Sequence, residues 1–209
     1  MGMLFGLAAS AAVFFDDRLH VIDWLGAVLV ITFSLFLLTV RELTAGLNRL
    51  SITLLGAIYA GFLLPQWVSL FRQPHGRAWT FWVLFVVMFG DTAAYFVGRS
   101  IGARKLAPRI SPSKTVEGAW GYLGGAVIAG IVAAKIFLAQ FGWSEIIVLS
   151  LIIGILGQLG DLFESWIKRA FAVKDSGKLL PGHGGLLDRL DSLIFPAVFT
   201  SAYLKVFHP

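Results

Sequence analysis

Long apolar runs separated by short polar segments dominate this sequence. The chain is 57% hydrophobic and only 14% charged, whereas a soluble domain carries about a quarter charged residues. Each interior run is apolar on all sides for about 17–21 residues, which is typical of a membrane span and not of an amphipathic surface helix. The sequence therefore predicts an all-α, polytopic membrane helix bundle with about seven spans. We expect its helices at residues 2–15, 24–40, 51–71, 79–98, 119–138, 145–165 and 192–207.

The first of these runs is short for a span. Its roughly fourteen apolar residues fall below the roughly 17–25 that cross a bilayer. It lacks the basic leader of a secretory signal, so we expect a short or tilted helix and not a cleaved peptide. No heptads, low-complexity linker or solenoid repeat divide the chain, which indicates a single membrane domain over residues 1–209. The absence of cysteine excludes disulfides and thiolate chemistry.

Basic residues are distributed unequally over the two sides of the predicted bundle. If the spans alternate, segments 41–50, 99–118 and 166–191 share one face, and this face carries twelve of the seventeen Lys and Arg residues. The opposite face and the C-terminal tail carry four, and Lys135 lies inside a run. The positive-inside rule places the basic face in the cytoplasm. The net charge of +5 therefore reflects membrane orientation, and we expect soluble nucleotides but no nucleic acid as partners.

The end of the sixth run carries an acid that a lipid environment does not explain. Asp161, Glu164, Ser165 and Lys168 recur three and four residues apart and so share one helix face. Ionised groups near bilayer depth are costly and usually line a cavity, pair with partners or bind ions. Snorkelling towards headgroups explains Lys168 and Arg169 by themselves. It does not explain Asp161, because an acid gains nothing from an anionic membrane surface.

Two more acids precede the last run, after a glycine-rich turn around His183. The glycines leave backbone N–H groups open to a phosphate, although such turns are common and His183 alone is more often a loop hydrogen-bonder than a base. Asp188 and Asp191 follow at i and i+3. Magnesium commonly takes one or two protein carboxylates plus substrate phosphates and water, so we expect Asp161 and Asp188 to meet across one ion. Helix capping explains one of the acids at this helix start, but not the whole set.

The segment after the fourth run combines bases, hydroxyls and turn residues. The order Ser-Pro-Ser-Lys-Thr-Val-Glu-Gly at residues 111–118 looks like a phosphate-contacting turn that runs into a helix. A basic loop that binds lipid headgroups accounts for the bases but not for this order. Asp91 lies about two turns inside the fourth run, where a buried acid needs a partner. Two roles are equally open for Asp91: it could pair with a structural arginine, or it could take part directly in catalysis.

These motifs together resemble a known family. From Ser165 to Asp191 the chain fits the signature of the phosphatidate cytidylyltransferase (CDP-diacylglycerol synthase) family without a mismatch. The motifs that begin at Gly90 and Ser111 also look like that family. The resemblance covers residues 79–200, which we expect to be the catalytic region. Family members are usually longer, so residues 1–78 resemble a truncated form of the family's apolar N-terminal spans.

The resemblance implies a magnesium-dependent reaction in which CTP and phosphatidate give CDP-diacylglycerol and pyrophosphate, a step of phospholipid biosynthesis. A second cation is compatible with the same acids. The implied metal ligands are Asp161, Asp188 and Asp191, and Lys168 and Arg189 complete the implied catalytic set. The residues implied to contact substrate phosphates are Ser111, Ser113, Lys114, Thr115, Lys168, Arg169, Lys174, His183, Gly184, Gly185 and Arg189.

The resemblance also implies where and with what the chain works. Family members look dimeric, so a homodimer is expected. The absence of a targeting leader favours a bacterial inner membrane, with the site facing the cytoplasm. The acyl tails of phosphatidate would stay in the bilayer while its headgroup enters sideways from the cytoplasmic leaflet.

Other functions fit parts of the pattern. A CTP-dependent lipid kinase of the polyprenol or phytol type is also a multispan protein with acidic motifs, but it would release CDP instead of pyrophosphate. A CDP-alcohol phosphotransferase fits less well, because the chain lacks the D-G-x-x-A-R frame. A membrane transporter or a non-catalytic scaffold with buried ion pairs is the alternative outside enzymes. Transporters commonly show interrupted spans in two halves, whereas the polar motifs here gather towards one end of the chain.

Overall fold

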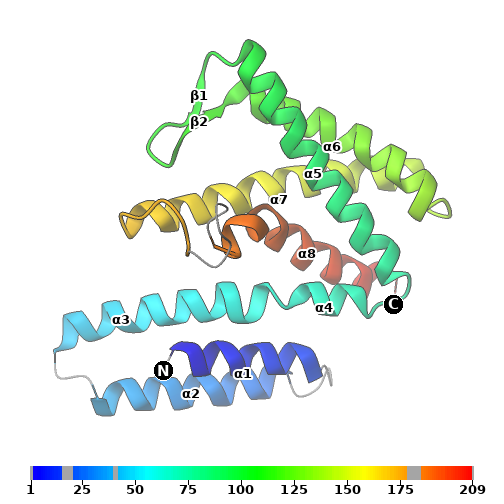
Figure 1. The fold of residues 1–209 in the computed structure, drawn as a ribbon. Helices are drawn as coiled ribbons and strands as arrows, with labels where there is room; N and C mark the ends of the chain where they lie inside the picture. The colour runs from blue at the N-terminus through cyan, green and yellow to red at the C-terminus, as the bar shows by residue number, and fades with distance from the viewer. Residues whose placement is uncertain (1, 16–20, 40–41, 178–184, 209) are drawn as a thin grey trace. The chain divides into compact units, whose positions relative to one another are not determined.

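The computed structural model describes residues 2–15, 21–39, 42–177 and 185–208 (Figure 1). The chain forms two compact units, Met1–Gln73 and Pro74–Pro209. A single membrane domain over all 209 residues stays a prediction. Helices dominate both units, which confirms the predicted all-α class. The described helical stretches that are long and apolar enough to cross a membrane are Thr44–Phe71, Gly76–Ile101, Val116–Phe137, Trp143–Ala170 and Leu187–Phe207.

The first unit consists of helices built from the N-terminal apolar runs. They are α1 (Gly2–Phe15), α2 (Val21–Thr39), α3 (Leu43–Gly56), the π-helical segment η1 (Ala57–Leu63) and α4 (Gln66–Phe71). Helix α1 packs closely on η1, where a methyl group on Gly61 would lie 2.6 Å from the Gly6 Cα. The Ser10 hydroxyl donates a 2.9 Å hydrogen bond to the Gly61 carbonyl at this contact. Pro65 follows the π-helical segment and lacks an N–H donor, which fits the break before α4.

The second unit contains four long helices and one hairpin. The helices are α5 (Gly76–Ile101), α6 (Val116–Phe137), α7 (Trp143–Ala170) and α8 (Leu187–Phe207). Figure 1 shows α7 and α8 side by side, with α5 and α6 crossing near them. Helices α5 and α6 approach closely because α6 presents glycines to α5: a methyl on Gly118 would lie 3.0 Å from the Ala94 carbonyl oxygen, and one on Gly121 2.7 Å from Val97 Cβ.

A two-stranded hairpin connects α5 to α6, and the sequence did not predict it. Strands β1 (Lys105–Ala107) and β2 (Ser111–Thr115) pair antiparallel, with Lys105 opposite Thr115 and Ala107 opposite Ser111. The segment that was expected to be a turn running into a helix is therefore a strand that leads directly into α6. Figure 1 shows the hairpin projecting from the end of the α5–α6 pair.

The long helices extend beyond the ends that hydropathy predicted. Helix α7 continues to Ala170 instead of residue 165, and α8 begins at Leu187 instead of residue 192. The third helix begins at Leu43 instead of residue 51, and Asn48 and Arg49 on its added turns are exposed. Hydropathy marks where a helix leaves lipid, whereas backbone hydrogen bonding continues through polar residues that can remain solvated. The extension of α8 places Asp188 and Asp191 within its first two turns.

Candidate active site

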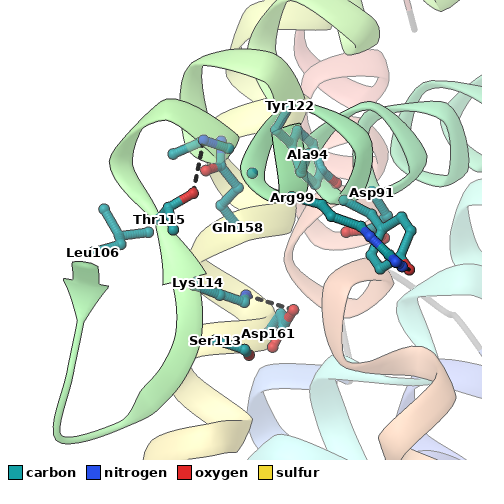
Figure 2. Close-up of a pocket in the computed structure, with 14 residues that line it drawn as sticks. Asp91, Ala94, Arg99, Leu106, Ser113, Lys114, Thr115, Tyr122, Gln158 and Asp161 are labelled. Atoms are coloured by element: carbon teal, nitrogen blue, oxygen red, sulfur yellow. Dashed lines mark hydrogen bonds and ion pairs between the residues drawn. The ribbon is translucent and has the colours of Figure 1, made fainter. Parts of the chain in front are cut away.

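A cavity of about 410 Å³ lies where α5, the hairpin, α6 and α7 meet (Figure 2). Side chains from all four elements line it, so residues far apart in the sequence face one space. The polar side chains among them are Asp91, Tyr95, Arg99, Ser113, Lys114, Thr115, Tyr122, Gln158 and Asp161. Carboxylate, ammonium, guanidinium and hydroxyl groups thus gather in one hollow of a helix bundle.

An ion pair joins two walls of this cavity. The Lys114 Nζ, on β2, lies 2.5 Å from Asp161 Oδ2, on α7, as Figure 2 shows. Both side chains are about one-quarter exposed, at 26% and 25%. The Ser165 hydroxyl, one turn further along α7, donates a 3.3 Å hydrogen bond to Asp161 Oδ1. Asp161 is therefore held by groups on the hairpin and on its own helix.

Two residues at the start of α6 fix the hairpin that carries Lys114. Thr115 caps α6, because its Oγ1 accepts a 3.1 Å hydrogen bond from the Gly118 N–H. Glu117 accepts hydrogen bonds from the backbone N–H groups of Ala103 and Arg104, at 3.1 and 3.2 Å, and from Arg104 Nε at 3.3 Å. These contacts close the base of the hairpin, and they set where Lys114 enters the cavity.

Further carboxylates surround the Lys114–Asp161 pair. Asp91, on α5, accepts a 3.3 Å hydrogen bond from the Ser192 hydroxyl on α8. Asp161 interacts electrostatically with Asp91 and with Asp191, the latter on α8. Helices α7 and α8 approach closely here, since a methyl group on Gly160 would overlap the Asp191 carbonyl oxygen. Three helices thus bring acids towards one region.

A second charged cluster lies between α7 and α8. Lys168 Nζ lies 2.8 Å from Asp188 Oδ1 and 3.5 Å from Glu164 Oε1. Asp188 also accepts hydrogen bonds from the backbone N–H groups of Ser176, at 2.9 Å to Oδ2, and Gly185, at 2.7 Å. This carboxylate therefore organises the chain on both sides of the α7–α8 connection.

Glu164 is the unusual member of that cluster. Its side chain is 4% exposed, and neither of its buried carboxylate oxygens has a hydrogen-bond partner within the described part of the chain. A buried carboxylate without donors is costly. The ammonium of Lys168, one turn away on the same helix, provides its compensation.

The sequence that forms this site matches a known protein family over almost its whole length. The profile of the Cytidylyltransferase family matches residues 1–207. The chain belongs to this family. The cytidylyltransferase family therefore accounts for the N-terminal helices as well as for the region around the cavity, and the predicted resemblance is confirmed.

Individual relatives carry a more specific name. The chain is 39% identical to the phosphatidate cytidylyltransferase of Brucella suis biovar 1 (strain 1330), in an alignment that covers 98% of this chain and 84% of the relative. It is 44% identical to the phosphatidate cytidylyltransferase of Bacillus subtilis (strain 168), over 73% of this chain and 57% of the relative. The protein of that name from Staphylococcus aureus (strain COL) is 46% identical over 59% of this chain and 47% of the relative. Membership of this family together with the long apolar helices makes the chain an integral membrane protein.

The structure distributes the residues expected to contact phosphate over three surroundings. Ser113, Lys114 and Thr115 line the cavity. Arg169 instead donates to the Ile110 carbonyl, at 3.3 Å, and so holds the tip of the hairpin. The remaining members lie outside the cavity lining or outside the described residues. Ser111, Lys168, Lys174, Gly185 and Arg189 are in the first group, and His183 and Gly184 are in the second.

Several cavity residues were not predicted to belong to the site. Gln158 lies one turn before Asp161 on the same face of α7, so its i, i+3 spacing was an available signal. Tyr122 gave no such signal. Its ring fits between helices because Gly90 and Gly157 have no side chain. A methyl group on Gly90 would lie 2.5 Å from the ring, and one on Gly157 would overlap the hydroxyl. Only the packing of α5, α6 and α7 reveals that position.

The acids differ from expectation in their partners. Asp161 pairs with Lys114, whereas Asp188 pairs with Lys168. No group of three acidic, His or Cys side chains within the described part of the chain is arranged to hold a metal ion. A cation shared by Asp161 and Asp188 therefore stays a prediction. A structural arginine was one of two roles left open for Asp91, and no such pair is found among the described ion pairs. The Ser192 hydroxyl donates to Asp91 instead.

The donor chemistry of the region nevertheless fits a hard cation. Carboxylates here outnumber the lysines that interact with them. Lys114 and Lys168 form ion pairs or longer electrostatic interactions with five acids. The acids are Asp91, Asp161, Glu164, Asp188 and Asp191. An excess of carboxylate oxygens suits magnesium, which needs only one or two protein carboxylates when phosphates and water complete its shell.

Proposed function

We propose that this chain transfers the cytidylyl group of CTP to phosphatidate, forming CDP-diacylglycerol and releasing pyrophosphate. The observation that carries the proposal is the cavity that holds Lys114 and Asp161 in a family of cytidylyltransferases whose named relatives include phosphatidate cytidylyltransferases. A water-soluble nucleotide and a membrane lipid must meet at such an enzyme. A polar cavity at one end of apolar helices meets that requirement.

The reaction needs charge control more than proton transfer. In the transfer, a phosphatidate oxygen forms a bond to the α-phosphorus of CTP while the bond from that phosphorus to the pyrophosphate oxygen breaks. Both reactants are polyanions, so their repulsion must be offset before they can approach. Phosphatidate is already ionised near neutral pH and needs no strong base. Positioning and electrostatic stabilisation then supply most of the rate.

Basic and hydroxyl groups of the chain are suited to hold the phosphates. We assign Lys114 to the phosphates of CTP. Two observations support this assignment: Lys114 lines the cavity, and its partner Asp161 is an acid whose charge a cation could neutralise instead. Ser113 and Thr115 offer hydroxyls on the same strand. The Thr115 oxygen also caps α6, so its hydrogen remains available as a donor. Lys168, next to Asp188, is the corresponding base between α7 and α8.

Magnesium is the proposed cofactor, and a second cation is compatible with the number of acids. Asp161, Asp188 and Asp191 are the residues that would hold it. When bound, the ion would neutralise phosphate charge and stabilise the leaving pyrophosphate. Lys114 and Lys168 pair with Asp161 and Asp188 in the structure, so both lysines would be available to substrate phosphates if these carboxylates held a cation.

The proposed setting follows from the charge distribution along the chain. The segments that carry the site are the basic ones, so the positive-inside rule supports a site that faces the cytoplasm. The bacterial relatives support a bacterial inner membrane as the proposed location. A homodimer is part of the proposal by family membership.

Product analysis tests the proposed function. Purified protein in detergent is incubated with phosphatidic acid and with CTP labelled either at the α-phosphorus or at the γ-phosphorus. We expect the α-label to enter the lipid and the γ-label to leave as pyrophosphate. Transfer of the γ-label to a lipid, with release of CDP, would instead show a CTP-dependent lipid kinase. Absence of labelled lipid in both arms would favour a non-catalytic scaffold or a transporter.

A further inference from the structure

One face of α5 carries a line of exposed side chains that leads to the cavity. Met88, Thr92, Tyr95 and Arg99 are spaced four, three and four residues apart, so they share one helix face. All four are exposed, Met88 at 62% and Tyr95 at 58%. The first of them lies in the apolar part of a membrane-capable helix, and the last lies in its final turn. The line therefore changes from apolar to cationic over about 16 Å of helix.

Arg99 and Tyr95 belong to two surfaces at once. Both are exposed on α5, and both also line the cavity that contains Lys114 and Asp161. Figure 2 shows Arg99 on the α5 wall, whereas Lys114 and Asp161 come from β2 and α7. The cavity is therefore open along the exposed face of α5, and Arg99 lies at that opening.

The Arg99 guanidinium is oriented, and most of its donors remain available. Its Nη1 donates a 2.7 Å hydrogen bond to the Tyr95 hydroxyl, and its Cζ lies 6.0 Å from the centre of the Tyr95 ring. No carboxylate in the described residues forms an ion pair with Arg99. Lys114, the other base that lines the cavity, is already paired with Asp161. Arginine presents five N–H donors in a fork that matches the oxygens of a phosphate.

From this geometry we infer that Arg99, oriented by Tyr95, receives the phosphomonoester headgroup of the lipid substrate at the opening of the cavity. This inference rests on the proposed function, which requires a lipid phosphate to reach the α-phosphorus of CTP. The apolar part of the line on α5 would lie along an acyl chain, and its polar end would meet the headgroup. Lys114 on the opposite wall is left for the nucleotide. The two phosphate-bearing substrates thus use different cations on different walls.

An arginine at the end of a membrane span also contacts bulk lipid phosphates. The two roles differ in the lipid that they recognise. A bulk contact responds to any anionic lipid, whereas a substrate contact responds to phosphatidate. The position of Arg99 on the cavity wall favours the substrate contact.

The test is steady-state kinetics in mixed micelles, with the mole fraction of phosphatidate and the concentration of CTP varied separately. We expect Arg99→Gln to raise the KM for phosphatidate by about tenfold or more and to leave the KM for CTP within about twofold, because one charge-assisted phosphate contact is lost. Arg99→Lys should restore part of the loss, since it keeps the charge but not the fork. Tyr95→Phe should raise the KM for phosphatidate by about threefold, because it removes only the orienting hydroxyl.

Arg77→Gln is the matched control. It removes the same charge from an exposed position of the same helix, but at the end opposite the cavity. A third arm replaces the neutral diluent lipid by an anionic phosphodiester lipid at constant phosphatidate. Thermal unfolding in detergent checks that each variant is folded.

Each outcome decides the inference. A rise in the KM for CTP instead of phosphatidate would assign Arg99 to the nucleotide and overturn it. Unchanged kinetics in Arg99→Gln, or a defect that follows the bulk anionic lipid and not phosphatidate, would also overturn it. Failure of the proposed function is seen separately, because the unsubstituted protein would then form no CDP-diacylglycerol at all.

Discussion

Lys114 Nζ on β2 and Asp161 Oδ2 on α7 lie 2.5 Å apart inside the cavity. The pair links a hairpin to a membrane-capable helix and places a cation and an acid where nucleotide phosphates would bind. Because both side chains are about one-quarter exposed, a substrate or an ion can replace either partner without opening the bundle.

Removing the charge of Asp161 or of Asp188, two of the three proposed metal ligands, should stop turnover. We expect Asp161→Asn and Asp188→Asn each to lower the rate of CDP-diacylglycerol formation by about 100-fold or more, because a neutral amide does not replace a carboxylate that would hold the cation. The measurement is pyrophosphate release, with thermal unfolding as a check on folding. Glu42→Gln, an exposed acid of the first unit, is the control and should behave as the unsubstituted protein. Normal turnover in either aspartate variant would remove that residue from the metal assignment.

Lys114→Ala should weaken the use of CTP. The ammonium that offsets triphosphate charge is lost, so we expect the KM for CTP to rise by about tenfold, which is the loss typical of one charge-assisted contact. The KM for phosphatidate should change by less than about twofold. Initial rates at varied CTP measure this effect. A CTP dependence equal to that of the unsubstituted protein would place the hairpin outside the nucleotide site.

Lys168 should be a strong determinant of stability. Lys168→Met leaves Glu164 and Asp188 without their shared ammonium, and breaking a buried ion pair on one side typically costs about 3–5 kcal/mol. The free energy of unfolding is measured by denaturant titration in mixed micelles. Adding Glu164→Gln to Lys168→Met should recover part of the loss, because it removes an acid whose oxygens have no hydrogen-bond donor among the described residues. Equal stability of the single and double variants would show that Lys168 does not compensate Glu164.

Two neighbouring glycines on α6 should respond oppositely to the same substitution. A methyl on Gly125 would overlap Ala93 Cβ and lie 3.1 Å from the Phe89 carbonyl oxygen, whereas one on Gly124 meets nothing within 4 Å. We expect Gly125→Ala to destabilise the fold by about 1–3 kcal/mol through overpacking against α5. Gly124→Ala should be neutral or stabilise by up to about 1 kcal/mol, because alanine favours helix. Thermal unfolding of both variants is compared, and equal shifts would contradict the close α5–α6 contact.

Chelation should reversibly abolish activity. With EDTA we expect no pyrophosphate release, and with excess magnesium we expect full recovery, because the acids would otherwise repel the triphosphate. Calcium at the same concentration is the control, since it prefers more ligands and longer distances. Turnover that persists after exhaustive chelation would leave the lysines and arginines as the only phosphate-neutralising groups.

The positions of most helices could be predicted from the sequence. In lipid every backbone polar group must be satisfied within the segment, so a long apolar run has little choice but to form a helix. The expected residues 2–15 agree with α1, and the runs at 79–98, 145–165 and 192–207 fall within α5, α7 and α8. The single helix expected at 51–71 was wrong, because this run is divided between α3, η1 and α4. The helix ends were wrong by several residues where polar turns extend α3, α7 and α8. The hairpin was missed because its short strands include a proline, Pro112, and two lysines, and show no alternating apolar pattern.

Part of the candidate site was predictable for a similar reason. Asp161, Lys114 and the hydroxyls at 113 and 115 are polar groups in a chain that has few, so their types and spacing indicated phosphate chemistry before any fold was known. Gln158 shares a helix face with Asp161, so the same spacing could have predicted that it belongs to the site. The position of Tyr122 could not be predicted in this way, because it depends on glycines of two other helices.

The order of residues alone determined which segments are helical and which of them carry charge into an apolar environment, because backbone hydrogen bonding and hydropathy act locally. Which charges meet was decided only by the packing of the helices. The crossing of α5, α6 and α7 brings Asp161 into an ion pair with Lys114, and it places Tyr95 and Arg99 in the lining of the same cavity. The packing of α7 on α8 places Lys168 between Glu164 and Asp188. Those pairings depend on contacts between residues distant in the chain, and local periodicity does not encode them.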